Sequence, residues 1–341
     1  MACLNTNIEV FKTSELMHYT NAAGLTGIIT NNCLWASHAD FLNDSTEMTH
    51  FFDERLPELI EPKIRACVLN HLKEDRDFAN KLCEFRGVES YIASETEVMV
   101  KILRVRTLEF NNPYIFSTSQ ACGRVAQSGL LSQWRGYGVD GGYALIFDLV
   151  KLQQLLGIEG KSFRYGCIFG GDVYYHGADD NCSCSEEIAE LERIVCDVIT
   201  RWARQRISEE EEEDSSEKFV KMADPISYLS CFYKHVGFTE EREYRFVMMP
   251  HRRDDPLSPE RMELESKPIK TFLRRGLPVP YIELGKQSIG LAKYVPLPIT
   301  RIIVGPHRDA ELRVGAVKKL LEAHGHGAVE VVRSAIPYIG Q

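Results

Sequence analysis

The chain has 341 residues, of which 44% are hydrophobic and 26% charged, with 14 Pro and 24 Gly. This composition is typical of a globular protein with a sizeable core, and it excludes collagen-like, low-complexity and largely disordered classes. The net charge of −9 argues against a protein that coats nucleic acid by bulk electrostatics.

The sequence predicts a cytoplasmic protein without a membrane segment. No stretch reaches the roughly 18 consecutive apolar residues of a membrane span, and residues 1–7 lack the features of a signal peptide. The ten cysteines are scattered and are typical of buried thiols. His176, Cys182 and Cys184 are close in sequence, but a second Cys/His pair at zinc spacing is missing, so we predict no metal site.

The first third of the chain predicts a strand, a helix and a second strand, followed by a helical segment. The opening elements are expected at 16–19, 22–30 and 34–37. Asp44 and Glu47 then have the spacing of a capping box, which favours a helix start. Further helical stretches follow, so we expect a helical insertion over about 51–110.

The middle of the chain combines strands with one long helix. Apolar, β-favouring runs predict strands at 114–116, 143–147 and 173–175. Apolar residues recur at helical spacing over 186–206 and predict an amphipathic helix. The acidic run that follows, over about 208–217, predicts a solvated mobile loop; a docking site for a basic partner is the alternative.

The last third predicts strands in pairs and singles and one helix. They are expected at 244–248, 269–273, 281–284, 302–304 and 329–332, with the helix at 309–323. Because the strands do not alternate regularly with helices, the pattern favours an α+β fold over a doubly wound parallel sheet. Gly-rich phosphate-binding fingerprints of the Walker and Rossmann types are missing from the sequence.

Four polar and aromatic clusters lie next to predicted element ends. Each has an ordinary structural interpretation: a hydrogen-bonded His, packed aromatics, an ion pair, or an N-cap. The clusters are residues 18–20, 41–44, 132–138 and 240–245.

In combination, these clusters resemble the ADP-ribosyltransferase superfamily. In that superfamily a strand ending in His, an aromatic residue or Gly, and Thr or Ser leads into a helix and a return strand, as His18-Tyr19-Thr20 does here. The run 114–119 and the helix carrying Trp134 and Tyr137 are similar in order to its middle motif, and Glu243 to its terminal glutamate.

With residues 302–306 added, the clusters resemble more closely the bacterial domain of unknown function 2971 family, over most of the chain. The resemblance implies a single ADP-ribosyltransferase-like domain over 1–341, with a mixed or antiparallel β core and peripheral helices. It also implies a transferase of the glycosyltransferase class that uses NAD as substrate.

The chemistry of NAD cleavage suits the residues that carry the resemblance. Breaking the nicotinamide–ribose bond passes through an oxocarbenium-like state, which needs a carboxylate near the anomeric centre. We therefore expect Glu243 to be catalytic and Glu241 to handle the acceptor. We expect His18 to hydrogen-bond a ribose hydroxyl or the adenosine side of NAD, and Tyr19 and Thr20 to contact the carboxamide. Ser117 is a further candidate for binding NAD, and Trp134 or Tyr137 is expected to stack on nicotinamide.

The sequence departs from one subclass pattern and leaves the acceptor open. Paired glutamates with Ser117-Thr118-Ser119 normally accompany Arg on the first strand, where this chain has His18. The resemblance suggests a toxin in bacterial anti-phage defence, restrained by a neutralising protein partner. The expected acceptor is a macromolecule, with RNA or DNA favoured, read by stacking in a local groove.

Two other classes of function remain open. One is a catalytically silent module that senses a nucleotide or binds a partner. The other is a metal-dependent nuclease in which His18, Asp40 or Asp44, and Glu243 hold a divalent ion.

Overall fold

The structure is a computed structural model, and it describes residues 14–42, 48–110, 112–138, 141–177, 186–208, 225–250, 263–285 and 295–337. The chain divides into two compact units, of which unit 1 comprises 1–41, 113–173 and 240–341, and unit 2 comprises 42–112 and 174–239. The sequence predicted one domain with an insertion over about 51–110. In the structure that insertion lies in unit 2, together with residues 174–239.

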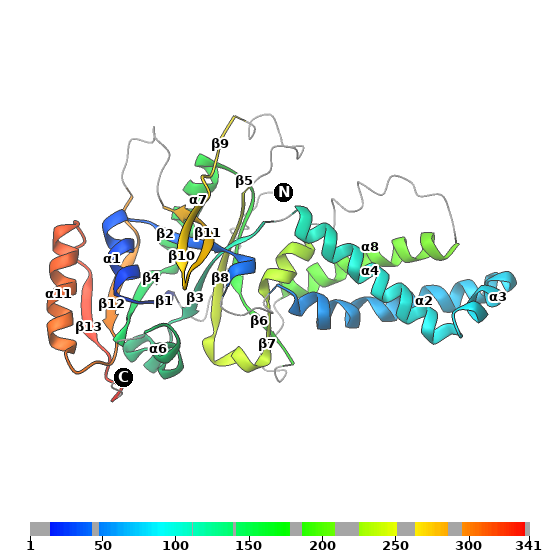
Figure 1. The fold of residues 1–341 in the computed structure, drawn as a ribbon, viewed down its shortest axis with the longest axis horizontal. Coiled ribbons are helices and arrows are strands. Elements are labelled where there is room, and N and C mark those ends of the chain that lie inside the picture. The colour runs from blue at the N-terminus through cyan, green and yellow to red at the C-terminus, as the bar shows by residue number, and fades with distance from the viewer. Residues whose placement is uncertain are drawn as a thin grey trace. The chain divides into compact units, whose positions relative to one another are not determined.

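Unit 1 is built on a mixed, mainly antiparallel sheet (Figure 1). Its strands are β1 (Glu15–Thr20), β2 (Leu34–His38), β3 (Tyr114–Gln120), β4 (Tyr143–Asp148), β5 (Phe163–Asp172), β8 (Glu243–Pro250), β9 (Glu265–Ser266), β10 (Lys270–Arg274), β11 (Leu277–Leu284), β12 (Ile299–Val304) and β13 (Glu330–Arg333). The spatial order is β10-β11-β2-β3-β1-β4-β12-β13; β8 pairs with both β3 and β5, and β9 with β5. Two of these pairs, β12–β13 and β5–β9, are parallel.

Helices and apolar side chains cover both faces of this sheet. The helical segments of unit 1 are α1 (Ala22–Asn31), η1 (Ala39–Phe41), α5 (Gly123–Ser128), α6 (Leu131–Tyr137), α7 (Leu149–Ser162) and α11 (Ala310–Ala323). The larger core joins one face of the sheet to α1, α7 and α11, through residues such as Leu25, Leu152 and Val317. A smaller core on the other face contains Met17 and Trp134. Because both faces are covered, β4 reads as a continuous apolar run.

Unit 2 consists of long helices and a two-stranded parallel sheet. Its elements are the π-helix η2 (Phe51–Arg55), α2 (Leu56–Glu74), α3 (Arg76–Glu84), α4 (Val88–Phe110), α8 (Glu186–Ser208), a helix over 225–232, β6 (Tyr174–His176), β7 (Tyr233–His235) and, at its end, η4 (Val236–Glu241). Helix α2 packs against both α4 and α8 (Figure 1). The predicted apolar stripe of α8 is buried, from Ile188 to Trp202.

The α+β class is confirmed, and so are most of the predicted elements. The strands predicted at 244–248, 281–284 and 302–304 and the helix at 309–323 are present, with ends that differ by a few residues. Helix α7 and strand β5 were not predicted. The acidic loop over about 208–217 and the Asp44–Glu47 capping box lie almost wholly outside the described residues.

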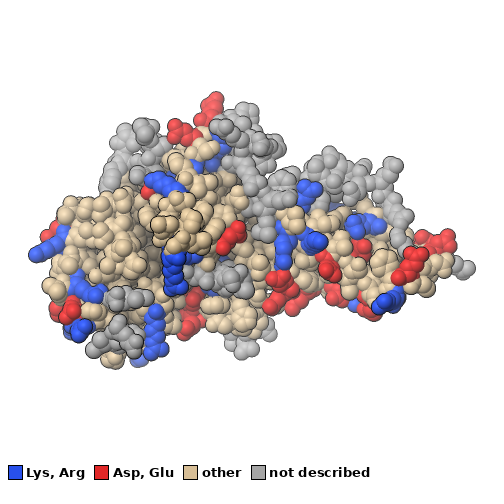
Figure 2. All heavy atoms as spheres, in the orientation of Figure 1, with Lys and Arg blue, Asp and Glu red and all other residues tan. Residues whose placement is uncertain are grey.

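Two properties of the described residues bear on membranes and on polyanions: the hydrophobicity of the helices and the distribution of charged side chains. None of the helices in the described ranges is long and apolar enough to cross a membrane. On the face seen in Figure 2, the Lys and Arg side chains that the structure describes are interspersed with Asp and Glu. This mixture agrees with a chain that does not bind polyanions by overall charge.

Candidate functional site

The candidate site in unit 1 lies where one edge of β3 changes its partner strand. Strand β8 pairs with β3 all the way from Tyr114 to Ser119 and so occupies one edge. The other edge pairs with β2 only at Tyr114 and Ile115, and with β1 only at Ser119 and Gln120. Strands β1 and β2 therefore form a fork on this edge, and residues 116–118 between them have no ladder partner there.

The imidazole of His18 lies in this fork. Its Nδ1 is 3.0 Å from the backbone oxygen of Ser117, and its ring centroid is 4.8 Å from that of Phe116. A carbonyl oxygen only accepts hydrogen bonds, so Nδ1 must carry the proton and donate. In the neutral ring Nε2 is then an acceptor, which suits a ligand hydroxyl. A hydrogen bond from a ribose hydroxyl to His18, as the sequence predicts, would use this nitrogen.

Burial lowers the pKa of His18, and the hydrogen bond with Ser117 offsets this only in part. As the pH falls, the unfolded chain therefore binds a proton at this imidazole before the folded chain does. The contribution of neutral His18 to stability is complete above pH 6.5 and is lost as the pH falls below it. We expect His18→Gln, which keeps a donor for the Ser117 carbonyl, to lose less stability on acidification than the wild type does. Thermal unfolding between pH 8 and pH 5.5 measures this. Equal losses in the two proteins would contradict the expectation.

Glu243 begins β8, opposite Ser119 of β3, and is held by a buried arginine. Its Oε1 accepts from Nε of Arg245, and its Oε2 from Nη2 of the same side chain, both at 2.9 Å. Arg245 is fully buried and Glu243 is 5% exposed. Such a two-bond contact fixes the plane of the carboxylate.

Alternation along the strands places the imidazole and the carboxylate on different faces of the sheet. His18 shares its face with Leu16 and Phe116, which belong to the larger core. Glu243 projects to the face opposite Tyr244, another member of that core. Strand spacing separates their backbones by roughly 10 Å. We expected these side chains to line one cleft; the structure brings together their strands, through β3, but not the side chains themselves.

The aromatic candidates differ in accessibility. Trp134 is 2% exposed, packs edge-on against Tyr19 with ring centroids 4.9 Å apart, and donates from Nε1 to the Ser128 oxygen. The Tyr19 hydroxyl accepts from the Leu130 amide, and burial raises the pKa of Tyr19 to about 12. Both rings are therefore packing residues of the smaller core. Tyr137, 40% exposed at the end of α6, is the aromatic ring accessible for stacking.

The remaining candidates lie on β1, on β3 and just before β8. Thr20 ends β1, next to α1, and Ser117 supplies the carbonyl that holds His18. Glu241 is half-buried at the end of η4 and precedes Arg242, whose φ of 43° turns the chain before β8 begins. Thr20 thus lies at the end of β1, Ser117 on the edge of β3 that forms the fork, and Glu241 just before β8, which occupies the other edge of β3.

The sequence predicted an ion pair in the cluster 240–245 but not that Glu243 pairs with Arg245, and it gave no sign of the close contact at Gly305. The spacing of Glu243 and Arg245 was a readable signal, because residues two apart on a strand share a face. At this contact, a Cβ on Gly305 would lie 1.8 Å from the oxygen of Gly141 and 2.9 Å from the Trp134 ring. Gly305 therefore allows the end of β12 to touch the turn before β4, a contact that the sequence alone does not reveal.

The metal-dependent nuclease alternative finds no support in the geometry of the described residues. The group of His and acidic side chains with ligand atoms close enough to share an ion includes neither His18, Asp40 nor Glu243. Asp44 lies outside the described residues.

Comparison with known proteins identifies one family. Residues 133–246 match the model of the family described as "Protein of unknown function (DUF2971)". The match begins within α6 and ends within β8, so it includes Trp134, Tyr137, Glu241 and Glu243. A search of the curated proteins and a search of the solved structures found no match.

Proposed function

We propose that this chain, whose residues 133–246 belong to the family described as "Protein of unknown function (DUF2971)", transfers ADP-ribose from NAD to a macromolecule. The observation that carries the proposal is the fork on β3. There a neutral imidazole, held by the Ser117 carbonyl, carries an acceptor nitrogen next to a stretch of β3 that has no ladder partner on this edge. A neutral acceptor nitrogen suits a ligand rich in hydroxyl groups.

In this proposal NAD lies in the fork and reaches both faces of the sheet. The ladder between β1 and β3 ends at Met17 and Ser119, and the proposal places the dinucleotide where these two strands are no longer paired. A dinucleotide has two riboses joined by a pyrophosphate. One ribose hydroxyl bonds to Nε2 of His18, and the other ribose lies against Glu243. Tyr137 stacks on the nicotinamide ring.

The reaction is a substitution at the anomeric carbon of the nicotinamide ribose. The bond from this carbon to nicotinamide breaks, and nicotinamide leaves with the electron pair. Glu243, oriented by Arg245, stabilises the positive charge that develops on the ribose. The acceptor forms the new bond to the same carbon and gives its proton to Glu241. An ADP-ribosyltransferase-like arrangement of unit 1 is part of this proposal.

We favour a nucleic-acid base as the acceptor. Because the surface seen in Figure 2 mixes acidic and basic side chains, its recognition would depend on local stacking and not on overall charge. Incubation of the purified chain with labelled NAD and, separately, RNA, DNA and cell protein tests this. We expect label in RNA or DNA together with nicotinamide release. Label in protein alone would refute the acceptor class, and no release with any acceptor would refute the transferase.

A silent nucleotide-binding module is the second candidate, and the pairing of Glu243 supports it. Both carboxylate oxygens bond to the buried Arg245, which is also the arrangement of a purely structural ion pair. This candidate predicts that NAD or a related nucleotide binds without release of nicotinamide. Calorimetric titration with NAD, run beside the release assay, separates the two candidates.

A further inference from the structure

Unit 2 contains a second cluster of chemically capable side chains, which the proposed function does not use. His50 and Glu54 lie one helical turn apart at the start of η2, and His176 lies at the end of β6. One ligand atom from each of the three lies within 4.8 Å of the other two. Two imidazoles and a carboxylate from distant parts of the chain therefore converge on one point.

Three features of the local fold produce this convergence. The π-helix η2 follows His50. Such helices are rare in proteins, and those that occur are often found at functional sites. Nδ1 of His50 lies 3.8 Å from Oε1 of Glu54. Parallel pairing of β6 with β7 then places His176 directly beside His235. The His50 ring is 6.0 Å from that of His176 and 5.8 Å from that of His235, centroid to centroid.

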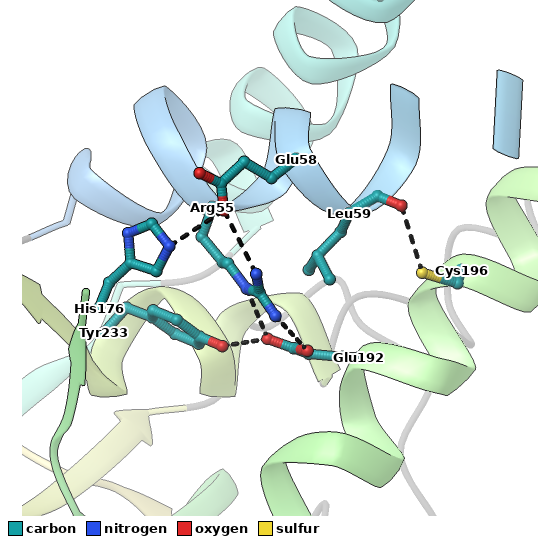
Figure 3. A network of polar contacts seen from close by, with 7 residues as sticks. All are labelled: Arg55, Glu58, Leu59, His176, Glu192, Cys196 and Tyr233. Carbon is teal, nitrogen blue, oxygen red and sulfur yellow. Dashed lines mark hydrogen bonds and ion pairs between the residues drawn. The ribbon is translucent and has the colours of Figure 1, made fainter. Parts of the chain in front are cut away.

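A network of charged and polar groups fixes the elements that carry these side chains (Figure 3). Glu58 Oε2 accepts from Nε2 of His176 at 3.0 Å and from Nη1 of Arg55 at 3.3 Å. Arg55 in turn holds the Glu192 carboxylate through two bonds of 2.8 and 2.9 Å. The Tyr233 hydroxyl donates to the same carboxylate. This network ties η2, β6, β7 and α8 together before any ligand binds.

We propose that His50, Glu54 and His176 bind a divalent transition-metal ion such as Zn²⁺. Two histidines and one carboxylate are a donor set that zinc accepts, and three protein ligands leave a fourth position for water or a substrate. A ligating histidine characteristically bonds to a carboxylate through its other nitrogen, as His176 does to Glu58. The nitrogen donors favour zinc over Mg²⁺ and Ca²⁺, which prefer oxygen ligands.

His235 lies beside His176 but does not belong to the converging group, so it would have to shift to become a ligand. The Gly237 amide donates to its Nδ1 at 3.1 Å, so Nε2 is the nitrogen that faces other partners. If His235 adds a fourth ligand, the site is closed and structural; if water takes that position, the site is open to a substrate. The metal site lies in unit 2, and metal binding there does not depend on NAD chemistry in unit 1.

Equilibrium dialysis of the metal-free full chain against Zn²⁺, with bound metal measured by mass spectrometry, tests the proposal. We expect one tightly bound Zn²⁺ per chain, with Mg²⁺ failing to compete. His176→Gln and Glu54→Gln, both at accessible positions, are each expected to weaken binding by at least about 100-fold. Glu58→Gln is expected to weaken it by about 10- to 100-fold through the orientation of His176.

His71→Gln is the matched control. His71 forms a similar pair with Asp75 four residues along α2, at 3.6 Å, but it is not part of the converging group. The zinc affinity of His71→Gln should equal that of the wild type. The absorption spectrum of bound Co²⁺ gives a second readout, which should change with His176→Gln while circular dichroism shows an unchanged fold. Equal zinc binding by the wild type, His176→Gln and Glu54→Gln, or none by the wild type, would overturn the proposal.

Discussion

Replacement of Glu243 by glutamine is expected to lower the rate of nicotinamide release from NAD by at least about 100-fold. The loss of one preorganised group that stabilises transition-state charge typically costs 10²- to 10³-fold in rate. Gln retains the size of Glu and one acceptor oxygen, so it removes mainly the negative charge opposite Arg245. The change leaves Arg245 buried beside a neutral amide, which destabilises the folded state. The release rate should therefore be normalised to the amount of folded protein.

Two variants separate chemistry from structure in this experiment. Glu240→Gln makes the same change at an exposed position of η4 and should leave release unchanged. Arg245→Lys keeps the positive charge but loses the two-bond contact, so it should lower release less than Glu243→Gln does. If Glu243→Gln released nicotinamide as fast as the wild type while remaining folded, Glu243 would be only one half of a buried ion pair.

Local sequence signals were sufficient for most strands and for the longest amphipathic helix. The apolar stripe from Ile188 to Trp202 has helical periodicity, and burial of that stripe is what stabilises α8. Helix α7 was missed although its signals were present: Asp148 accepts a capping bond from the Lys151 amide, and leucines recur at helical spacing. Gly157 and Gly160 interrupt that pattern, and Gly disfavours a helix interior.

The candidate sites depend on contacts that no local pattern encodes. The bond between His18 and Ser117 joins residues 99 positions apart, and it requires the fork between β1 and β2. The Trp134 ring, expected against a ligand, packs instead on Tyr19, because burial of a large ring stabilises a core more than exposure does. Sequence reasoning therefore finds candidate groups at element ends, whereas strand pairing decides which of them meet.

A buried ion pair of unit 1 leads to the second large expected effect. Lys267, 6% exposed, contacts Oε1 of Glu159, which is 3% exposed on α7. The same carboxylate accepts from the Tyr165 hydroxyl at 2.9 Å and from the Gly285 amide at 3.2 Å. The Lys267 ammonium also lies 3.9 Å from the centroid of the Phe163 ring. Burial lowers the pKa of Lys267, and the Glu159 carboxylate partly offsets that effect.

Lys267→Met is expected to lower the free energy of unfolding by about 3–5 kcal/mol, because it leaves the Glu159 carboxylate buried without its countercharge. Differential scanning calorimetry should show this as a downward shift of the unfolding temperature by roughly 10 °C. Lys151→Met is the control, since Lys151 pairs with Asp148 at 3.5 Å on the surface. The loss of such an exposed pair costs at most about 1 kcal/mol.

The double variant Lys267→Met with Glu159→Gln shows whether the unpaired charge is the cause. Tyr165 and Gly285 donate to different oxygens of Glu159, so Gln removes the charge and keeps an acceptor for one of them. It should therefore recover part of the stability that Lys267→Met loses. Glu159→Gln alone should also destabilise unit 1, because it leaves the Lys267 ammonium buried without a carboxylate. If the two single losses instead added in the double variant, the ion pair would contribute nothing and packing around the lysine stem would explain the effect.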